Sequence, residues 1–263
     1  DPNAQREESQ YIDRNIKATL SAYGLGDVEA STYDATTTAE AGQLMHDAES
    51  TTSIRLLDPN LVSPAFKQRQ QNKQYYSFDS QLNVDRYGVS GESRDTVIAV
   101  REMSQEGLDA GQRTWINDHT VYTHGYGVVT AYGNTASSDG SPAFWEGGIP
   151  SEGELGDYEP RIYFGKSTPS YSIVGGDDGG NPRELDYPDD TAASGQINTT
   201  FTGSGGPSVS NPFNRLLYAT KFAEMNILFS QEVRPGSQIL YDRDPAKRVA
   251  KVAPWLTLDG NPY

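Results

Sequence analysis

The sequence predicts an α+β fold, with a central, mostly antiparallel sheet, helices at both ends of the chain and a long Gly/Asp-rich excursion. Apolar residues recur at helical spacing near both ends, and segments rich in β-branched and aromatic residues fill the middle. Strands and helices do not alternate strictly, which favours α+β over a doubly wound sheet. We expect 1–175 and 213–263 to form one domain, with 176–212 as a loop-rich insert.

The N-terminal part predicts two helices followed by a turn-rich segment. The first helix, over 8–23, has Ser9 as its cap and Gly24 as its left-handed stop. A weaker helix is expected over 37–48, and a short strand with two proline turns over 54–66. The apolar stripe of the first helix comprises Ile12, Ile16, Leu20 and Tyr23.

The middle of the chain, 75–132, predicts most of the sheet. Its segments are rich in β-branched and aromatic residues and are separated by Gly, Asp and Ser. A Gly/Ser/Pro loop is expected at 133–142, and further strands at 161–166 and 171–175. The four segments of the middle region are QYYSFD, LNVDRYGV, DTVIAVREM and TWINDHTVYTHGYGVVTAYG.

Residues 176–212 contain almost no core-forming side chains. They are therefore either a long mobile excursion or a lobe held by hydrogen bonds or ions. Beyond them, Asn211 caps and Pro212 opens a helix expected to run to about 229. Its buried stripe is expected to comprise Leu216, Thr220, Ala223 and Ile227.

The last expected helix is capped by Asp244 and faces Val249 and Val252 inward. Residues 255–258 are typical of a strand that leads into a hairpin turn at 259–260, and the returning strand is missing. We therefore expect the chain to be a piece of a longer protein.

Composition excludes several classes of function. The net charge is −15, which disfavours nucleic acid and anionic lipid surfaces as partners but leaves cations, basic partners and glycans open. The chain has no cysteine, which excludes disulfides, cysteine-ligated zinc and cysteine nucleophiles. No stretch of these residues is apolar enough for a membrane helix, which needs about 18 apolar residues.

Two of the three histidines, His119 and His124, lie close together in the sequence. Five residues apart, their side chains would lie on opposite faces of a strand, or about 140° apart on a helix. A zinc site would therefore need a kink and a third ligand from elsewhere. The spacing disfavours this interpretation.

A polar ridge along the same expected strand is the best candidate for chemistry. Histidine beside a carboxylate or a phenol is a plausible proton-transfer pair, so His124 with Asp118 or Tyr122 is the catalytic candidate. A hydrogen-bonded sheet network without catalysis is the favoured alternative. The ridge comprises Asp118, Thr120, Tyr122, His124 and Tyr126, and the ligand-binding candidates are Tyr122, His124, Tyr126 and His119.

Acidic clusters in the insert suggest calcium, a hard cation that binds several carboxylate and carbonyl oxygens. There is no EF-hand loop, and acidic surface loops without a metal are common, so calcium is only a possibility and no other cofactor is expected. The candidate ligands are Asp177, Asp178, Asp186, Asp189 and Asp190.

The segments taken together resemble uncharacterised protein family 0182, whose members are large integral membrane proteins common in actinobacteria. The most specific pair of segments is YTHGYG with PRIYFG. The resemblance implies a multi-helix membrane portion before Asp1, more protein after Tyr263, and a position of this part on the extracytoplasmic side of the cell membrane. It implies no activity and no catalytic residues. Other matching runs are QYIDRNIKATLSAYGL, RLLDPNLVSPAF, QNKQYYSFDSQLNVDRY, TVIAVRE, RELDYP, NRLLYATKF and AKRVAKVAPWLTLDG.

Three hypotheses about function follow. The first is a soluble extracytoplasmic domain without enzymatic activity that binds a protein partner, a glycan or an ion. The second is a hydrolase or transferase domain acting on envelope polymers through His124. The third is a structural cap that supports transport by the membrane portion, with the protein's own membrane helices as its partner.

Overall fold

The computed structural model describes residues 7–28 and 56–258. The chain divides into two compact units, 1–48 and 49–263, whereas the sequence suggested one domain for 1–175 with 213–263. The described part of the first unit contains α2, Ser9–Ala22. This confirms the first expected helix, although Glu8 rather than Ser9 is the N-cap residue. The helix expected over 37–48 lies outside the described residues.

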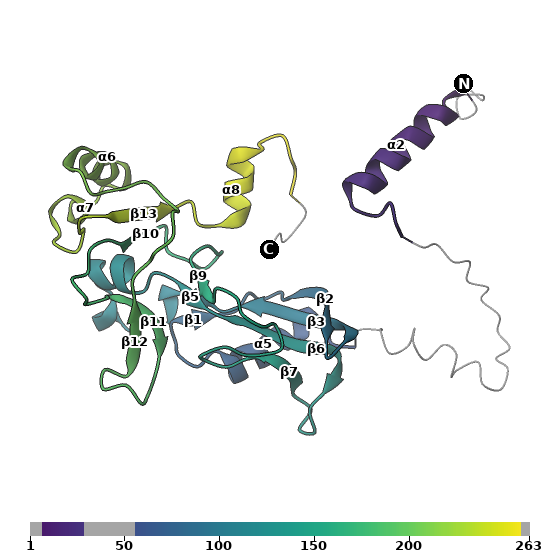
Figure 1. Ribbon diagram of the computed structural model, residues 1–263, viewed down its shortest axis with the longest axis horizontal. Coiled ribbons are helices and arrows are strands. Elements are labelled where there is room, and N and C mark those ends of the chain that lie inside the picture. The colour runs from purple at the N-terminus through teal and green to yellow at the C-terminus, as the bar shows by residue number, and fades with distance from the viewer. Residues whose placement is uncertain (1–6, 29–55, 259–263) are drawn as a thin grey trace. The chain divides into compact units, whose positions relative to one another are not determined.

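A five-stranded antiparallel sheet forms one part of the second unit, in the order β2-β3-β6-β7-β8 (Figure 1). It confirms the predicted central sheet. Its inner face packs against Phe66 of α5 and Phe78, whose rings meet edge to face. The strands are β2 Asn83–Val89, β3 Glu92–Val100, β6 Val128–Ala136, β7 Pro142–Gly147 and β8 Glu152–Gly153.

Helix α5, Pro59–Gln70, replaces the strand and proline turns expected over 54–66. The Asp58 side chain accepts a hydrogen bond from the backbone N–H of Asn60, and Pro59 occupies the first turn, where its missing N–H costs nothing. Pro64 lies inside the helix. The expectation was wrong because burial of Phe66 against the sheet outweighs the helix-breaking tendency of one proline.

Four smaller two-stranded sheets complete the second unit. Strand β13 was not predicted; it pairs with β10 in the sheet that packs against the C-terminal helices. The pairs are β1 Tyr76–Ser77 with β4 Glu102–Met103, β5 Gly125–Tyr126 with β9 Arg161–Ile162, β10 Tyr171–Gly175 with β13 Ser237–Tyr241, and β11 Glu184–Pro188 with β12 Gln196–Thr199.

Residues 115–121 are helical, not extended as predicted. They include a π-helical turn, η3 Asn117–Val121, and follow two short 3₁₀ turns, η1 Gln105–Gly107 and η2 Ala110–Gln112. Polar side chains bond to backbone carbonyls one turn back: the Thr120 hydroxyl donates to the Ile116 carbonyl at 2.7 Å. Such local bonds satisfy the backbone without a neighbouring strand.

Part of the Gly/Asp-rich insert is a hairpin, β11–β12, which extends from the rest of the second unit (Figure 1). Leu185 and Val209 are buried, and the acidic side chains of Glu184 and Asp186 are buried with them. Of the two alternatives that the sequence left open, the structure shows a lobe held by hydrogen bonds.

The C-terminal helices are α6 Pro212–Phe222, α7 Asn226–Phe229 and α8 Pro245–Val252. The caps Asn211 and Asp244 are confirmed, since each side chain accepts from a backbone N–H. The single helix expected up to 229 is wrong, because Ala223 adopts φ +52° and ends α6. Residues 255–258 form no strand, and 259–260 lie outside the described residues.

The expected inward stripes of α6 and α8 are largely wrong. Ile227 is buried, but Leu216, Thr220, Val249 and Val252 are exposed. On α6, the residues that face the core are instead Ala219 and Phe222. The ring of Phe222 packs against Tyr171 of β10 and Tyr241 of β13.

Candidate functional site

His124 lies in a buried polar cluster where the chain enters β5, and its side chain has 0% exposed surface. The Thr123 hydroxyl lies 2.9 Å from Nδ1 of His124 and donates to Oε2 of Glu184, also at 2.9 Å. Because a threonine hydroxyl has one proton to give, the contact with His124 requires a proton on Nδ1. The cluster thus holds this ring in one orientation.

Glu184 of β11 accepts four hydrogen bonds. Oε2 accepts from the Thr123 hydroxyl and from the Tyr163 hydroxyl at 3.1 Å. Oε1 accepts from the backbone N–H groups of Gly175 at 2.8 Å and Phe201 at 2.9 Å. Burial, followed by the charge of Glu184, raises the pKa of Tyr163, so the phenol stays protonated. Both carboxylate oxygens are engaged, which is the geometry of a structural anchor.

Asp186 forms the second acidic contact of the cluster. Arg161 holds it in a bidentate ion pair, with Nε and Nη2 each 2.8 Å from a carboxylate oxygen. Nε2 of His124 lies 3.6 Å from Oδ1, beyond hydrogen-bond length. Burial acts to raise the pKa of Asp186, but the interactions with His124 and Arg161 outweigh it and lower the pKa below its usual value. The carboxylate is therefore ionised and paired.

A buried guanidinium, that of Arg243, ties the cluster to β10. It donates to the carbonyls of Tyr163 and Thr123 and to the Ser172 hydroxyl at 2.7 Å. Burial lowers the pKa of Arg243 to about 10, so the side chain remains charged at neutral pH. The carboxylates and guanidinium groups of the cluster are thus bonded within it, whereas Nε2 of His124 is buried and has no hydrogen-bond partner among the described residues.

The predicted catalytic arrangement does not form. Asp118 pairs with Arg113 at 2.9 Å, and Tyr122 packs against Tyr75, so neither side chain joins His124. The ridge prediction was wrong because 117–121 is helical, so alternate residues do not share a face there.

The other ligand-binding candidates lie in separate places. His119 stacks on Tyr171, apart from His124, and its Nδ1 lies 2.9 Å from the carbonyl of Tyr171. Tyr126 packs against Tyr187 of β11, near Asp186. The two histidines therefore share no ligand set.

The acidic calcium candidates are each engaged locally. Asp178 and Asp189 accept from Thr200 and Thr191, and Asp190 pairs with Lys73 at 3.3 Å. Across the described ranges 7–28 and 56–258, no group of three or more His, Cys, Asp or Glu is arranged to hold a metal. The remaining candidates are Asp177, which accepts from the Gly179 N–H, and Asp186, held by Arg161.

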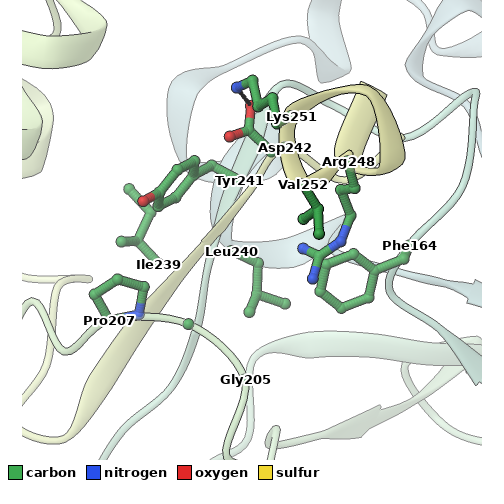
Figure 2. A pocket seen from close by; sticks show the side chains of 11 residues that line it. Phe164, Gly205, Pro207, Ile239, Leu240, Tyr241, Asp242, Arg248, Lys251 and Val252 are labelled. Carbon is green, nitrogen blue, oxygen red and sulfur yellow. Dashed lines mark ion pairs between the residues drawn. The ribbon is translucent and has the colours of Figure 1, made fainter. Parts of the chain in front are cut away.

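A pocket of about 310 Å³ lies under α8, built from four separate segments (Figure 2). Phe164 follows β9 and forms one wall, residues 205–207 form another, and 239–242 of β13 and its continuation form the floor. Arg248, Lys251 and Val252 of α8 complete the lining. The floor and walls combine apolar side chains with charged ones.

Gly206 allows the loop at 205–207 to lie directly on β13. It adopts φ +96°, and a Cβ atom there would lie 2.5 Å from the carbonyl oxygen of Ile239. The N–H of Ile239 donates to the carbonyl of Pro207 at 3.0 Å. Because N–H groups alternate along a strand, the N–H of Tyr241 points to this same edge, along which the pocket lies. The backbone edge of β13 therefore borders the pocket, in addition to the side chains that line it.

The charges at the mouth of the pocket are unequally paired. Asp242 adopts φ +51°, turning the chain from β13 towards α8, and Lys251 pairs with it at 2.5 Å. The hydrogen bond from Lys251 lowers the pKa of Asp242. The guanidinium of Arg248 instead lies over the ring of Phe164, 4.7 Å from its centroid, and pairs with no acid in the described part of the chain (Figure 2). The pocket lining thus holds two cations, Arg248 and Lys251, and one carboxylate, Asp242, whose pKa both cations lower.

The sequence analysis missed this pocket. The signals available were the basic run KRVAK (247–251) in an otherwise acidic chain and, earlier in the sequence, the glycine pair at 205–206. Neither feature shows which other segments complete the pocket, because the lining comes from segments up to 88 residues apart (164 to 252).

Comparison with known proteins places the chain in a family. The model of the Uncharacterised protein family (UPF0182) matches residues 1–263. A UPF0182 protein of Bifidobacterium adolescentis is 58% identical over 265 residues, covering all of this chain and 24% of that protein. A UPF0182 protein of Tropheryma whipplei is 56% identical, and one of Paenarthrobacter aurescens 54%; each match covers the whole chain and 27% of the relative.

The chain thus spans about a quarter of the length of the curated relatives it matches. No solved structure matches. Within the described residues, no helix has the length and apolar character needed to cross a membrane. The match along the whole chain means that it belongs to the uncharacterised protein family UPF0182.

Proposed function

We propose that this chain is a non-enzymatic binding domain of an integral membrane protein, and that its pocket under α8 takes an anionic group of an envelope partner or glycan. The observation that carries the proposal is the Arg248 guanidinium, which lies on Phe164 at the pocket and forms no salt bridge in the described ranges. Arginine presents several donors in a planar fork that suits carboxylate and phosphate groups.

The charge distribution supports an anionic ligand despite the net charge of −15. Helix α8 carries three cations within eight residues, Lys247, Arg248 and Lys251. Exposed charges more than about 8–10 Å apart are largely screened at physiological ionic strength. A ligand at the pocket therefore responds mainly to the nearby charges, those of α8 and Asp242, rather than to the distant acidic surface.

The lining also favours a ligand with an apolar portion. Leu240, Val252 and Phe164 surround the space beside the guanidinium (Figure 2). A volume of about 310 Å³ is at the lower end of the range for small-molecule sites. We infer a carboxylate or phosphate attached to a compact apolar group, as opposed to a bare ion.

Binding is favoured over catalysis because of where the ionisable groups lie. At the pocket they are two cations, Asp242, which is paired with Lys251, and Tyr241, whose hydroxyl is hydrogen-bonded to Tyr218. His124, the candidate base, is sealed in the core with its neighbours engaged. General acid–base catalysis needs such a group within hydrogen-bond reach of the substrate.

The test is ligand-observed ¹⁹F NMR on the purified protein with 4-(trifluoromethyl)benzoate, using the neutral 4-(trifluoromethyl)benzamide as the matched probe. The benzoate signal should broaden with the wild type and not with Arg248→Gln. A charge-assisted bond contributes about 1.5–3 kcal/mol, so a roughly 10- to 100-fold loss of affinity is expected. Lys247→Gln removes the same charge from the same helix, outside the pocket lining, and should leave affinity nearly unchanged.

Equal binding of the acid and the amide, or equal losses in the Arg248 and Lys247 variants, would refute the proposed site. The first result would mean that the pocket selects only apolar groups. The second would mean that the helix attracts anions through its overall charge.

We propose an extracytoplasmic position for this domain at the cell membrane. The support is the family resemblance, with its membrane portion, and relatives about four times as long as this chain. Because the chain has no cysteine, Ser138→Cys creates a single thiol within it at an exposed position. A membrane-impermeant maleimide should label this thiol in intact cells; labelling only after lysis would place the domain in the cytoplasm.

A further inference from the structure

The outer surface of α6 and α7 carries large apolar side chains. Phe213 is 67% exposed, Leu217 51% and Phe229 72%. Leu216 and Met225 are similarly exposed. We call these five residues the α6–α7 apolar face. Residues 213, 216 and 217 recur at the three- and four-residue spacing of a single helix stripe. They therefore form a continuous stripe rather than isolated apolar positions.

The opposite side of α6 is also apolar, and it is already packed. Ala219 is buried, and the ring of Phe222 stacks on Tyr171 with 4.4 Å between centroids. Ile227 of α7 is fully buried in the same cluster. Helix α6 is thus hydrophobic on two faces, a pattern found in helices that are buried on both sides. A surface helix needs only one apolar stripe.

Charge is sparse around this face. Residues 212–229 contain Arg215, Lys221 and Glu224, for a net charge of +1 in a chain whose net charge is −15. Arg215 is directed inward, donating to the carbonyls of Val209 and Val233. Lys221 lies over the ring of Tyr241, 3.7 Å from its centroid. The acidic residues that cover much of the chain are thus nearly absent here, as is usual at the centre of protein interfaces.

The longer relatives contain further polypeptide that is available to cover the α6–α7 apolar face. Each matches this chain from end to end, yet the match spans only 24% to 27% of the relative. About three quarters of those polypeptides therefore lies outside the region matched here. An exposed stripe that a folded neighbour covers in the longer chain is the expected result of viewing one part of such a protein alone.

We infer that the α6–α7 apolar face docks against an apolar segment of the same polypeptide that lies outside these 263 residues. The contact is intramolecular and permanent, so the face is an internal boundary of the full-length protein. It is separate from the pocket under α8, since none of its five residues lines that pocket.

The test is photo-crosslinking in the full-length protein, with p-benzoylphenylalanine in place of Leu217 or Phe229. Exposed Ser138, in the β6–β7 connection, serves as the control position. After irradiation and proteolysis, mass spectrometry should identify cross-links from 217 and 229 to peptides outside the 263 residues, and none from 138. Three results would each overturn the inference: cross-links to the α6–α7 peptide of a second copy of the protein, cross-links to lipid, or no cross-links.

A matched pair of substitutions gives an independent readout in the full-length protein. Leu217→Gln removes apolar contact at the proposed boundary and should lower the thermal unfolding midpoint. Leu61→Gln changes the same residue type at another exposed helix position, 77% exposed on α5, and should leave the midpoint unchanged. Equal midpoints in the two variants would mean that Leu217 remains in solvent in the whole protein.

Discussion

The imidazole ring of His119 lies flat on the phenol ring of Tyr171, with 3.9 Å between the ring centroids and 2° between the ring planes. Nδ1 of His119 also lies 2.9 Å from the carbonyl oxygen of Tyr171. Burial lowers the pKa of His119, and the bond to Tyr171 only partly opposes this. The folded protein therefore holds His119 in its neutral form, as an aromatic packing element that joins η3 to β10.

This contact predicts a pH dependence of stability. The folded-state pKa of His119 is below its unfolded value of about 6.5, so the unfolded chain binds more protons between the two values. The contribution of neutral His119 to the free energy of unfolding is complete above about pH 6.5 and is lost as the pH falls through the folded pKa. Urea unfolding from pH 7.5 to 5.5 should show a falling free energy of unfolding. His119→Phe keeps the stacking and should flatten that slope; an unchanged slope would assign it to other groups.

Glu184→Gln should loosen the β11 attachment. Each carboxylate oxygen of Glu184 accepts two hydrogen bonds. In glutamine an NH₂ group replaces one of these oxygens, so two donor groups of the protein would face another donor. We expect a loss of about 2–4 kcal/mol in the free energy of unfolding. Hydrogen exchange at the amides of Gly175 and Phe201 should accelerate. Exposed Glu152→Gln serves as the control, and unchanged exchange in the Glu184 variant would contradict the anchoring role.

Asp186→Asn should remove the bidentate partner of Arg161 and destabilise the protein by about 2–3 kcal/mol at pH 7, because Asp186 is buried and Arg161 is only partly exposed. The pKa of Asp186 is lowered in the folded state, so its contribution is present above about pH 3.9 and is lost as the pH falls through the folded value. The difference between variant and wild type should therefore shrink in strong acid. Asp190→Asn breaks an exposed pair with Lys73 and should cost less than about 1 kcal/mol.

Pro64→Ala should stabilise the protein. Pro64 is exposed inside α5 and cannot donate to the carbonyl one turn back. Restoring that bond should raise the free energy of unfolding by about 1–2 kcal/mol, after allowance for the greater freedom of the unfolded chain. Pro59→Ala is the matched control: proline suits the first turn, so this change should be neutral or destabilising. Chemical denaturation of both variants checks the difference.

Local signals explain what the sequence predicted well. The caps Asn211 and Asp244 act on backbone groups two or three residues away, so the pattern of each helix start is complete within one turn. Strands β2, β3 and β6 of the five-stranded sheet are likewise indicated by β-branched residues within each segment, whereas β7 and β8 contain none and were not predicted.

Long-range contacts explain what it missed. Residues 115–121 become helical partly because Trp115 packs in the cluster of β10 and α6 and donates to the hydroxyl of Tyr171, 56 residues away. The cluster around His124 depends on Glu184 and Asp186. The sequence placed both in the loop-rich insert, and it offered only Asp186 as a calcium candidate. No local pattern indicates which acidic residues fold inward. The stripes of α6 and α8 were misplaced since periodicity shows that a helix has an apolar side, but not what covers it.

The β11–β12 hairpin has a base fixed in the core and an exposed turn, which touches the rest of the second unit through the pair of Asp190 with Lys73. Its base is held by Glu184 and Asp186, whereas the turn beyond Pro188 closes on itself through the bond from the Asp189 N–H to the Gly195 carbonyl at 3.1 Å. Residues 193–195 are exposed. This makes the turn a natural point for splicing in an epitope or a fluorescent reporter, so that full-length UPF0182 proteins can be tracked in cells without altering either the α8 pocket or the α6–α7 apolar face.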